Sequence, residues 1–128
     1  MMMTRVLFLA LTLGLSAVAP AHAADLSGTW SGSGSVSPKD GKTEAVRCKV
    51  TYSPEGSAIG VSATCASSST TIRQTGSLTK VSDTKYVGDF YNSDYDISGR
   101  VRVSVSGSSQ TVTFASPRGS GSLSLSRR

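Results

Sequence analysis

Hydrophobic and polar residues alternate strictly along most of this chain beyond residue 25. In the first such run Leu26, Gly28 and Trp30 occupy even positions, while serines and threonines fill the odd ones. Because a β-strand points successive side chains to opposite faces, this period of two predicts a strand with one buried face. No segment after residue 23 shows the 3.6-residue period of an amphipathic helix. The pattern therefore predicts an all-β domain.

The same alternation predicts seven further strands, separated by short segments rich in Gly, Pro, Asn, Asp and Ser. The residues expected to point inward are Val46, Cys48, Val50 and Tyr52, then Ile59, Val61, Ala63 and Cys65, then Ile72 and Leu78, then Tyr86, Gly88 and Phe90, then Tyr95, Ile97, Gly99, Val101, Val103 and Val105, then Val112 and Phe114, and finally Leu123 and Leu125. Eight short strands joined by brief turns predict a sequential antiparallel meander.

A meander of this kind has two edge strands, and closing the sheet into a barrel removes both edges. Eight strands leave an interior that is either filled by side chains or able to hold one small ligand. Glycines at inward positions, such as Gly32 and Gly88, are expected to leave room inside. We therefore expect a single eight-stranded antiparallel up-and-down barrel, with a two-sheet β-sandwich as the alternative.

The first 23 residues have a different pattern. Arg5 precedes an almost unbroken apolar run over residues 6–19, and Ala21-His22-Ala23 has the small-x-small form that signal peptidase accepts. The run is about 14 residues long, shorter than the roughly 20 that a membrane-spanning helix needs. We predict a helical signal peptide over residues 1–23, cleaved after Ala23, and one domain over residues 24–128 in the periplasm or outside the cell.

Export changes how the two cysteines are interpreted. Cys48 and Cys65 fall on the inward face of adjacent predicted strands, which is the placement that a bridge between neighbouring strands requires. In an oxidising compartment an even number of cysteines predicts a disulfide. On the chain-entropy model, closing this loop stabilises the fold by roughly 3 kcal/mol.

Composition limits the chemistry that the exported domain can perform. Loss of the leader removes His22, the sole histidine, and leaves 12 basic and 8 acidic residues. Without histidine, and with oxidised cysteines, the domain lacks the groups for Ser-His-Asp or Cys-His catalysis and for histidine-bound zinc. Asp89, Asp94 and Asp96 flank a predicted turn, where aspartates commonly cap the backbone. We expect no enzyme activity, no cofactor and no metal site.

The segment Leu26-Ser27-Gly28-Thr29-Trp30 resembles the opening strand of the calycin superfamily, which includes lipocalins, avidins and small bacterial inhibitors of secreted metalloproteases. Gly28 and Trp30 match the Gly-x-Trp motif of that group. The resemblance implies a meander barrel and a basic residue late in the last strand that lies across the tryptophan. Arg127 continues the inward parity of the last strand, so it is the candidate for closing the barrel or touching a ligand beside Trp30. The inhibitors carry an N-terminal arm, whereas only residues 24 and 25 precede this strand.

Basic residues occupy outward positions on two predicted strands, Arg47 and Lys49 on one and Arg100 and Arg102 on the other, with Arg128 at the end. They are candidates for a patch that binds an anionic surface. The neighbouring outward residues are mainly serine and threonine, and no aromatic residues interleave with the cations. Single-stranded nucleic acid needs such aromatic rings for stacking, so we expect no nucleic-acid partner.

Three functional hypotheses follow from these features. The first is a non-enzymatic, monomeric, calycin-like binding module for a small apolar ligand or a secreted or envelope protein. The second is an inhibitor of a secreted protease. The third is an envelope-associated structural protein that uses its basic residues to hold an anionic surface.

Overall fold

The computed structural model describes residues 26–128 as eight β-strands and no helix. The predicted signal peptide and its cleavage site lie outside the described residues. The strands are β1 (Gly28–Pro38), β2 (Glu44–Glu55), β3 (Ala58–Ala66), β4 (Thr71–Ser82), β5 (Lys85–Asn92), β6 (Ile97–Ser106), β7 (Ser109–Ser116) and β8 (Gly119–Arg127). Within the described residues no helix is long and apolar enough to cross a membrane.

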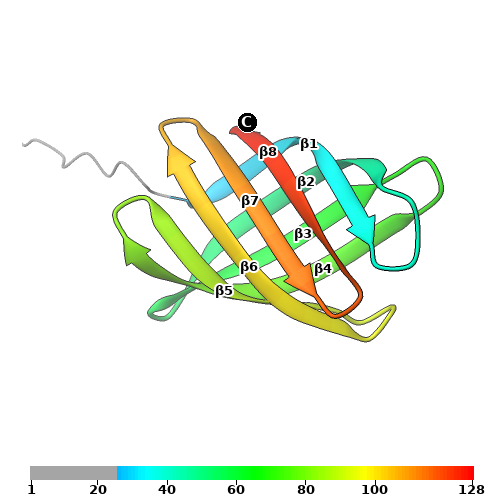
Figure 1. Ribbon diagram of the computed structural model, residues 1–128. Coiled ribbons are helices and arrows are strands. Elements are labelled where there is room, and N and C mark those ends of the chain that lie inside the picture. Colours follow the sequence, from blue (N-terminus) through cyan, green and yellow to red (C-terminus); the bar gives the residue numbers. More distant parts are fainter. Residues whose placement is uncertain (1–25) are drawn as a thin grey trace, which may run out of the picture.

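The strands form one closed antiparallel barrel in which each strand pairs with its neighbours in sequence (Figure 1). The last strand returns to the first, with register pairs that run from Trp30 opposite Arg127 to Pro38 opposite Gly119. The predicted up-and-down barrel is confirmed. The sandwich alternative is wrong, because the pairing of β8 with β1 leaves no open edge.

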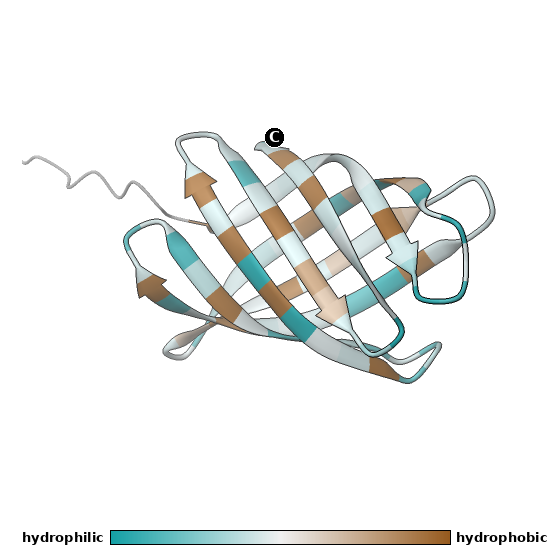
Figure 2. Cartoon of the chain, in the orientation of Figure 1, coloured by the Kyte–Doolittle hydropathy of each residue, from teal (hydrophilic) through white to brown (hydrophobic). Residues whose placement is uncertain are grey.

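Hydrophobic and hydrophilic residues alternate along the strands (Figure 2), and the large apolar residues at the inward positions are mostly buried. On β2 every second residue from Val46 to Tyr52 is buried, and the residues between them are exposed. The same rule holds on β6, where Val103 and Val105 are buried beside exposed polar neighbours. Burying one side chain of this size stabilises the folded state by about 2 kcal/mol, because its apolar surface is removed from water. The inward-facing half of the sheet is thus the hydrophobic core.

Two inward glycines sit where the backbone of a neighbouring strand approaches closely. A methyl group at Gly32 on β1 would overlap the backbone of β8 at Ser124, and one at Gly88 on β5 would overlap the backbone of β4 at Ser77. The neighbouring strand therefore occupies the space of the missing side chain, as glycine kinks in closed sheets allow. The expectation that these glycines leave room inside is wrong at these two positions.

These two close approaches lie at opposite seams, β8/β1 and β4/β5, since four strands separate them on either side of an eight-stranded ring. These two seams divide the ring into two halves, β1–β4 and β5–β8, which we call layers. Figure 1 looks onto the β5–β8 layer, with β1–β4 behind it.

The prediction that Tyr95 begins the sixth strand is wrong. Tyr95 lies in the turn between β5 and β6 with about half of its surface exposed, and the strand begins at Ile97. The buried Asn92 at the end of β5 causes this, because its Oδ1 accepts a hydrogen bond of 3.1 Å from the backbone N–H of Tyr95 and fixes the turn. Asp96 then adopts a left-handed φ of 53°, which an aspartate tolerates better than most residues.

We expect Gly88→Ala to lower the free energy of unfolding by about 2–3 kcal/mol, because the new methyl group would meet fixed backbone and not a movable side chain. Gly41→Ala is the matched control, since its methyl would meet only the Pro38 side chain at an ordinary 3.5 Å. Urea unfolding of both variants measures the difference. Equal stability of the two variants would contradict the close approach of β4 to β5.

Candidate functional site

One end of the barrel is closed by Trp30 and the residues around it. The Trp30 side chain is completely buried, and its Nε1 donates a hydrogen bond of 3.0 Å to the Leu26 carbonyl oxygen. The guanidinium carbon of Arg127 lies 4.5 Å from the centre of the Trp30 ring. Arg127 Nη1 also donates a 2.6 Å hydrogen bond to the carbonyl oxygen of Ser27. This arrangement joins the first and last strands and seals what we call the closed end.

The largest fully buried side chains gather at the closed end. Trp30, Leu26, Leu78 and Leu125 are each no more than 1% exposed. Leu26 precedes β1, whereas Leu78 and Leu125 lie close to the last residues of their strands. Neither of the two interior cavities described below is lined by Trp30 or Arg127. Trp30 and Arg127 thus lie opposite each other at the seam between β8 and β1, away from both cavities.

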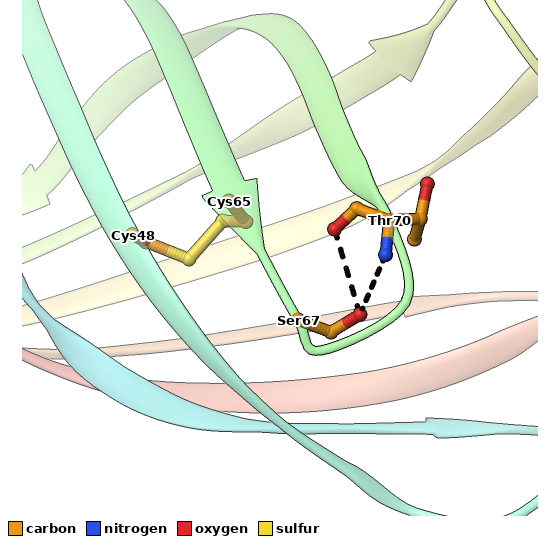
Figure 3. Close-up of a disulfide and its surroundings, with 4 residues drawn as sticks. All are labelled: Cys48, Cys65, Ser67 and Thr70. Carbon is orange, nitrogen blue, oxygen red and sulfur yellow. Dashed lines mark hydrogen bonds between the residues drawn. A yellow bond between two sulfur atoms is a disulfide. The ribbon is translucent and has the colours of Figure 1, made fainter.

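The predicted disulfide is present between Cys48 and Cys65 (Figure 3). The two residues stand directly opposite each other on β2 and β3, and both side chains point into the barrel. Just beyond Cys65, the Ser67 hydroxyl oxygen accepts a 3.2 Å hydrogen bond from the backbone N–H of Thr70, which holds the turn into β4. The bridge thus sits at the inner wall of the cavity described next, where Cys65 lines it.

The opposite end of the barrel, which we call the mouth, contains a cavity of about 180 Å³. Strand β1 runs from Trp30 at the closed end to Pro38 at the mouth, a distance of about 26 Å. All eight strands contribute to the lining, which consists of Val36, Pro38, Val46, Cys65, Ile72, Gln74, Phe90, Asn92, Tyr95, Ile97, Phe114, Ser116, Arg118, Gly119 and Ser120. The lining is mainly apolar, which is typical of sites for small organic ligands.

Two phenylalanines form the floor of the mouth cavity. The Phe90 and Phe114 rings meet edge to face, with centroids 5.9 Å apart and planes at 80°. Each ring covers a cross-strand glycine, Gly99 and Gly121 respectively. Both rings also line a second cavity of about 50 Å³ deeper in the barrel. The phenylalanine pair therefore stands between the two interior spaces.

Sequence reasoning missed the polar residues inside the barrel. Gln74 lies at an inward position of β4 and lines both cavities, and within the described residues its side chain has no hydrogen-bond partner. Gln110 is buried near the closed end, where its Oε1 accepts a hydrogen bond from the Tyr52 hydroxyl and its Nε2 has no partner. The signal was available, because each glutamine is a polar residue at a position whose parity points inward.

The basic residues predicted to form one patch do not lie together. Arg47 and Lys49 are on β2, whereas Arg100 and Arg102 are on β6, four strands away on the opposite side of the barrel. Arg100 Nε is also 3.2 Å from the Asp89 carboxylate, so an acidic partner offsets its charge.

Two of the three predicted turn aspartates, Asp89 and Asp96, make local contacts. Asp96 accepts a 3.2 Å hydrogen bond from the Tyr91 hydroxyl, and this bond together with the carboxylate charge raises the pKa of Tyr91. Asp89 pairs with Arg100 across β5 and β6. The described residues contain no group of three or more His, Cys, Asp or Glu side chains that could hold a metal ion.

No protein-family model and no curated protein sequence matches this chain. Solved structures of designed barrels share its fold. The redesigned barrel mFAP1 bound to DFHBI is 17% identical with a TM-score of 0.64, and covers 80% of this chain and 94% of its own. EF1p2_mFAP2b bound to DFHBI is 16% identical with a TM-score of 0.67 and the same coverage. A de novo designed fluorescence-activating β-barrel is 23% identical with a TM-score of 0.61, covering 80% of this chain and 93% of its own.

These likenesses show the fold alone. They agree with the meander barrel that the calycin resemblance implied. No match links the chain to lipocalins or to metalloprotease inhibitors by sequence.

We expect Arg127→Gln to lower the free energy of unfolding by about 1–2 kcal/mol, because it removes the contact with the Trp30 ring and the hydrogen bond to Ser27. Arg102→Gln, which removes the same charge from an outward position on β6, should change stability by less than about 0.5 kcal/mol. Urea unfolding followed by fluorescence of the only tryptophan measures both. Equal losses in the two variants would argue against closure by Arg127.

Stability should also fall in alkali because of Tyr52. Burial raises the pKa of the Tyr52 phenol far above its ordinary value near 10. Above pH 10 the unfolded chain releases this proton while the folded barrel keeps it, so the free energy of unfolding drops by about 1.4 kcal/mol per pH unit. Tyr52→Phe should remove the share of that slope due to Tyr52, and Tyr95→Phe, at an exposed position, should leave the slope unchanged. An unchanged slope in Tyr52→Phe would contradict this assignment.

Proposed function

We propose that this protein is an exported, non-enzymatic module that binds a small apolar ligand in the mouth cavity. The proposal rests on the unequal filling of the barrel interior. Bulky side chains fill the closed end, while the mouth holds a largely apolar space of about 180 Å³. An engineered protein cavity of about 150 Å³ binds benzene, so this space suits a ligand with about one ring.

The polar groups of the cavity suggest how such a ligand is oriented. Gln74 projects into an otherwise apolar part of the wall and supplies two N–H donors and one carbonyl acceptor. Satisfying this amide is worth about 1 kcal/mol and would favour a ring that carries one hydroxyl or carbonyl group. Arg118, Ser116 and Tyr95 lie at the rim, where a ligand's polar substituent can stay in contact with water.

Two further observations favour ligand binding over the other hypotheses. Two of the designed barrels with this fold are bound to DFHBI, so a barrel of this architecture can hold a small molecule. Among the described residues the longest connection between strands is the segment 39–43, so the described part offers no long loop to insert into a protease cleft. The ligand module is therefore the better supported hypothesis.

We expect p-cresol and indole to bind the wild-type protein, because each presents one apolar ring system and one donor. In Ile97→Trp the affinity should fall by about tenfold or more, since the larger side chain fills the mouth where Ile97 lines it. Val81→Trp is the matched control, because Val81 is exposed and lines neither interior cavity. Chemical-shift titration of the amide signals gives the affinities and locates the perturbed residues.

A second variant tests the role of the amide. Gln74→Leu should lower the affinity for p-cresol several-fold and leave the affinity for toluene unchanged, since only p-cresol can form a hydrogen bond with the Gln74 amide. The proposal would be overturned if neither probe shifted residues of the mouth, or if Ile97→Trp and Val81→Trp bound p-cresol equally well.

A further inference from the structure

A cluster of cations covers the outer surface of the β1–β4 layer. Lys49 on β2 is opposite Thr64 on β3, and Thr64 is opposite Arg73 on β4, so the two cations flank one threonine in a single row. Arg47 occupies the next outward position on β2. The Arg128 side chain reaches the same area, because its Nη1 donates a 3.5 Å hydrogen bond to Ser31, the β1 neighbour of Lys49. We call Arg47, Lys49, Arg73 and Arg128 the basic face.

The basic face is a continuous surface and not a set of scattered charges. A shallow hollow on the outside of the barrel is lined by Arg47, Lys49 and Arg128, together with hydroxyl groups of Ser31 and Thr64. Arg73 extends it by one strand through Thr64. Cations and hydroxyl donors therefore alternate across neighbouring strands.

Carboxylates are kept away from the middle of this face. The outward positions between the ends of β1–β4 carry no acidic residue, and the two acids of β2 stand at its ends. Glu44 accepts a hydrogen bond from Ser69, and Glu55 lies against Gly60. On the opposite layer, by contrast, Arg100 is paired with Asp89. The cations of the basic face thus have no acidic residue among the outward positions between them, whereas Arg100 on the opposite layer has one beside it.

The chemistry of the face points to one kind of partner. The large hydrophobic side chains exposed on the described residues are Val81, Tyr91 and Tyr95. Tyr91 borders the basic face at one edge, because it is opposite Thr75, the next outward residue after Arg73. The hollow around Lys49 is lined by no large apolar side chain that could anchor in a bilayer and by no ring, and one tyrosine at the edge is not the series of rings that stacks successive nucleic-acid bases. The basic face offers cations for carboxylate or sulfate groups and hydroxyls for the hydroxyl groups of sugars.

We propose that the basic face binds a linear acidic polysaccharide. Binding is independent of the mouth cavity, which opens at the end of the barrel and not on this side. Cations that neutralise a linear polyanion release its condensed counterions, so affinity should fall steeply with salt.

Retention on alginate and heparin columns tests the proposal, with elution salt as the readout. The variant Arg47→Gln/Lys49→Gln/Arg73→Gln should bind both polymers about tenfold or more weakly and with a shallower salt dependence. The control Lys85→Gln/Arg100→Gln/Arg102→Gln removes the same charge from the opposite layer and should behave like the wild type. The variant Arg47→Lys/Arg73→Lys should retain binding, and the Trp30 emission spectrum confirms that each variant is folded.

Several outcomes would overturn it. Equal loss in the two triple variants would show an effect of net charge and not of this face. If the wild-type protein were not retained on either column at low salt, the proposed polysaccharide site would be ruled out. Tighter binding to vesicles containing phosphatidylglycerol, or to a single-stranded oligothymidine, than to alginate and heparin would assign the face to a different class of partner.

Discussion

The pairing of β8 with β1 is the constraint on which the rest of this structure depends. Without it the meander would have two long edge strands, and its apolar face would have nothing to pack against. At one end of the seam, the Arg127 side chain packs against the Trp30 ring and donates a hydrogen bond to the Ser27 carbonyl oxygen. Along the seam, Gly32 allows the backbone of β8 to cross closely over β1. Closure is thus achieved by one aromatic–cation contact and by the absence of a side chain where the strands approach closely.

The same constraint distributes space inside the barrel. The bulky residues that secure the seam are concentrated at the closed end, so the remaining volume lies toward the mouth. There the Phe90–Phe114 pair forms a floor, and Gln74 provides a polar group without a partner among the described residues. The closed ring also turns the outer faces of β1–β4 and β5–β8 in opposite directions, so the basic face lies on one half only. The interior and the basic face are therefore two independent surfaces of one scaffold.

Alternation along the chain was sufficient to predict the strands and to place Cys48 and Cys65 on the same face of adjacent strands, because a period of two fixes which side chains share a face. The barrel was predicted from the number of strands and from the need to remove sheet edges. Alternation was not sufficient for Tyr95, whose parity fits β6 but whose backbone is held in a turn by Asn92. The prediction of one patch containing Arg47, Lys49, Arg100 and Arg102 was wrong for a similar reason. Parity shows that Arg47 and Arg100 both point outward, but only the closure of the ring shows that they point in opposite directions. The polar residues inside the barrel were visible in the sequence as exceptions to the alternation.

The account rests on a ligand-accessible mouth opposite a sealed end. Intermolecular nuclear Overhauser effects between bound p-cresol and the protein test this most directly, because they report which side chains touch the ring. The account predicts contacts from the probe to Ile72, Ile97 and Phe114 and none to Trp30. Contacts to Trp30, or contacts confined to the serine and threonine residues of the outer surface, would contradict it.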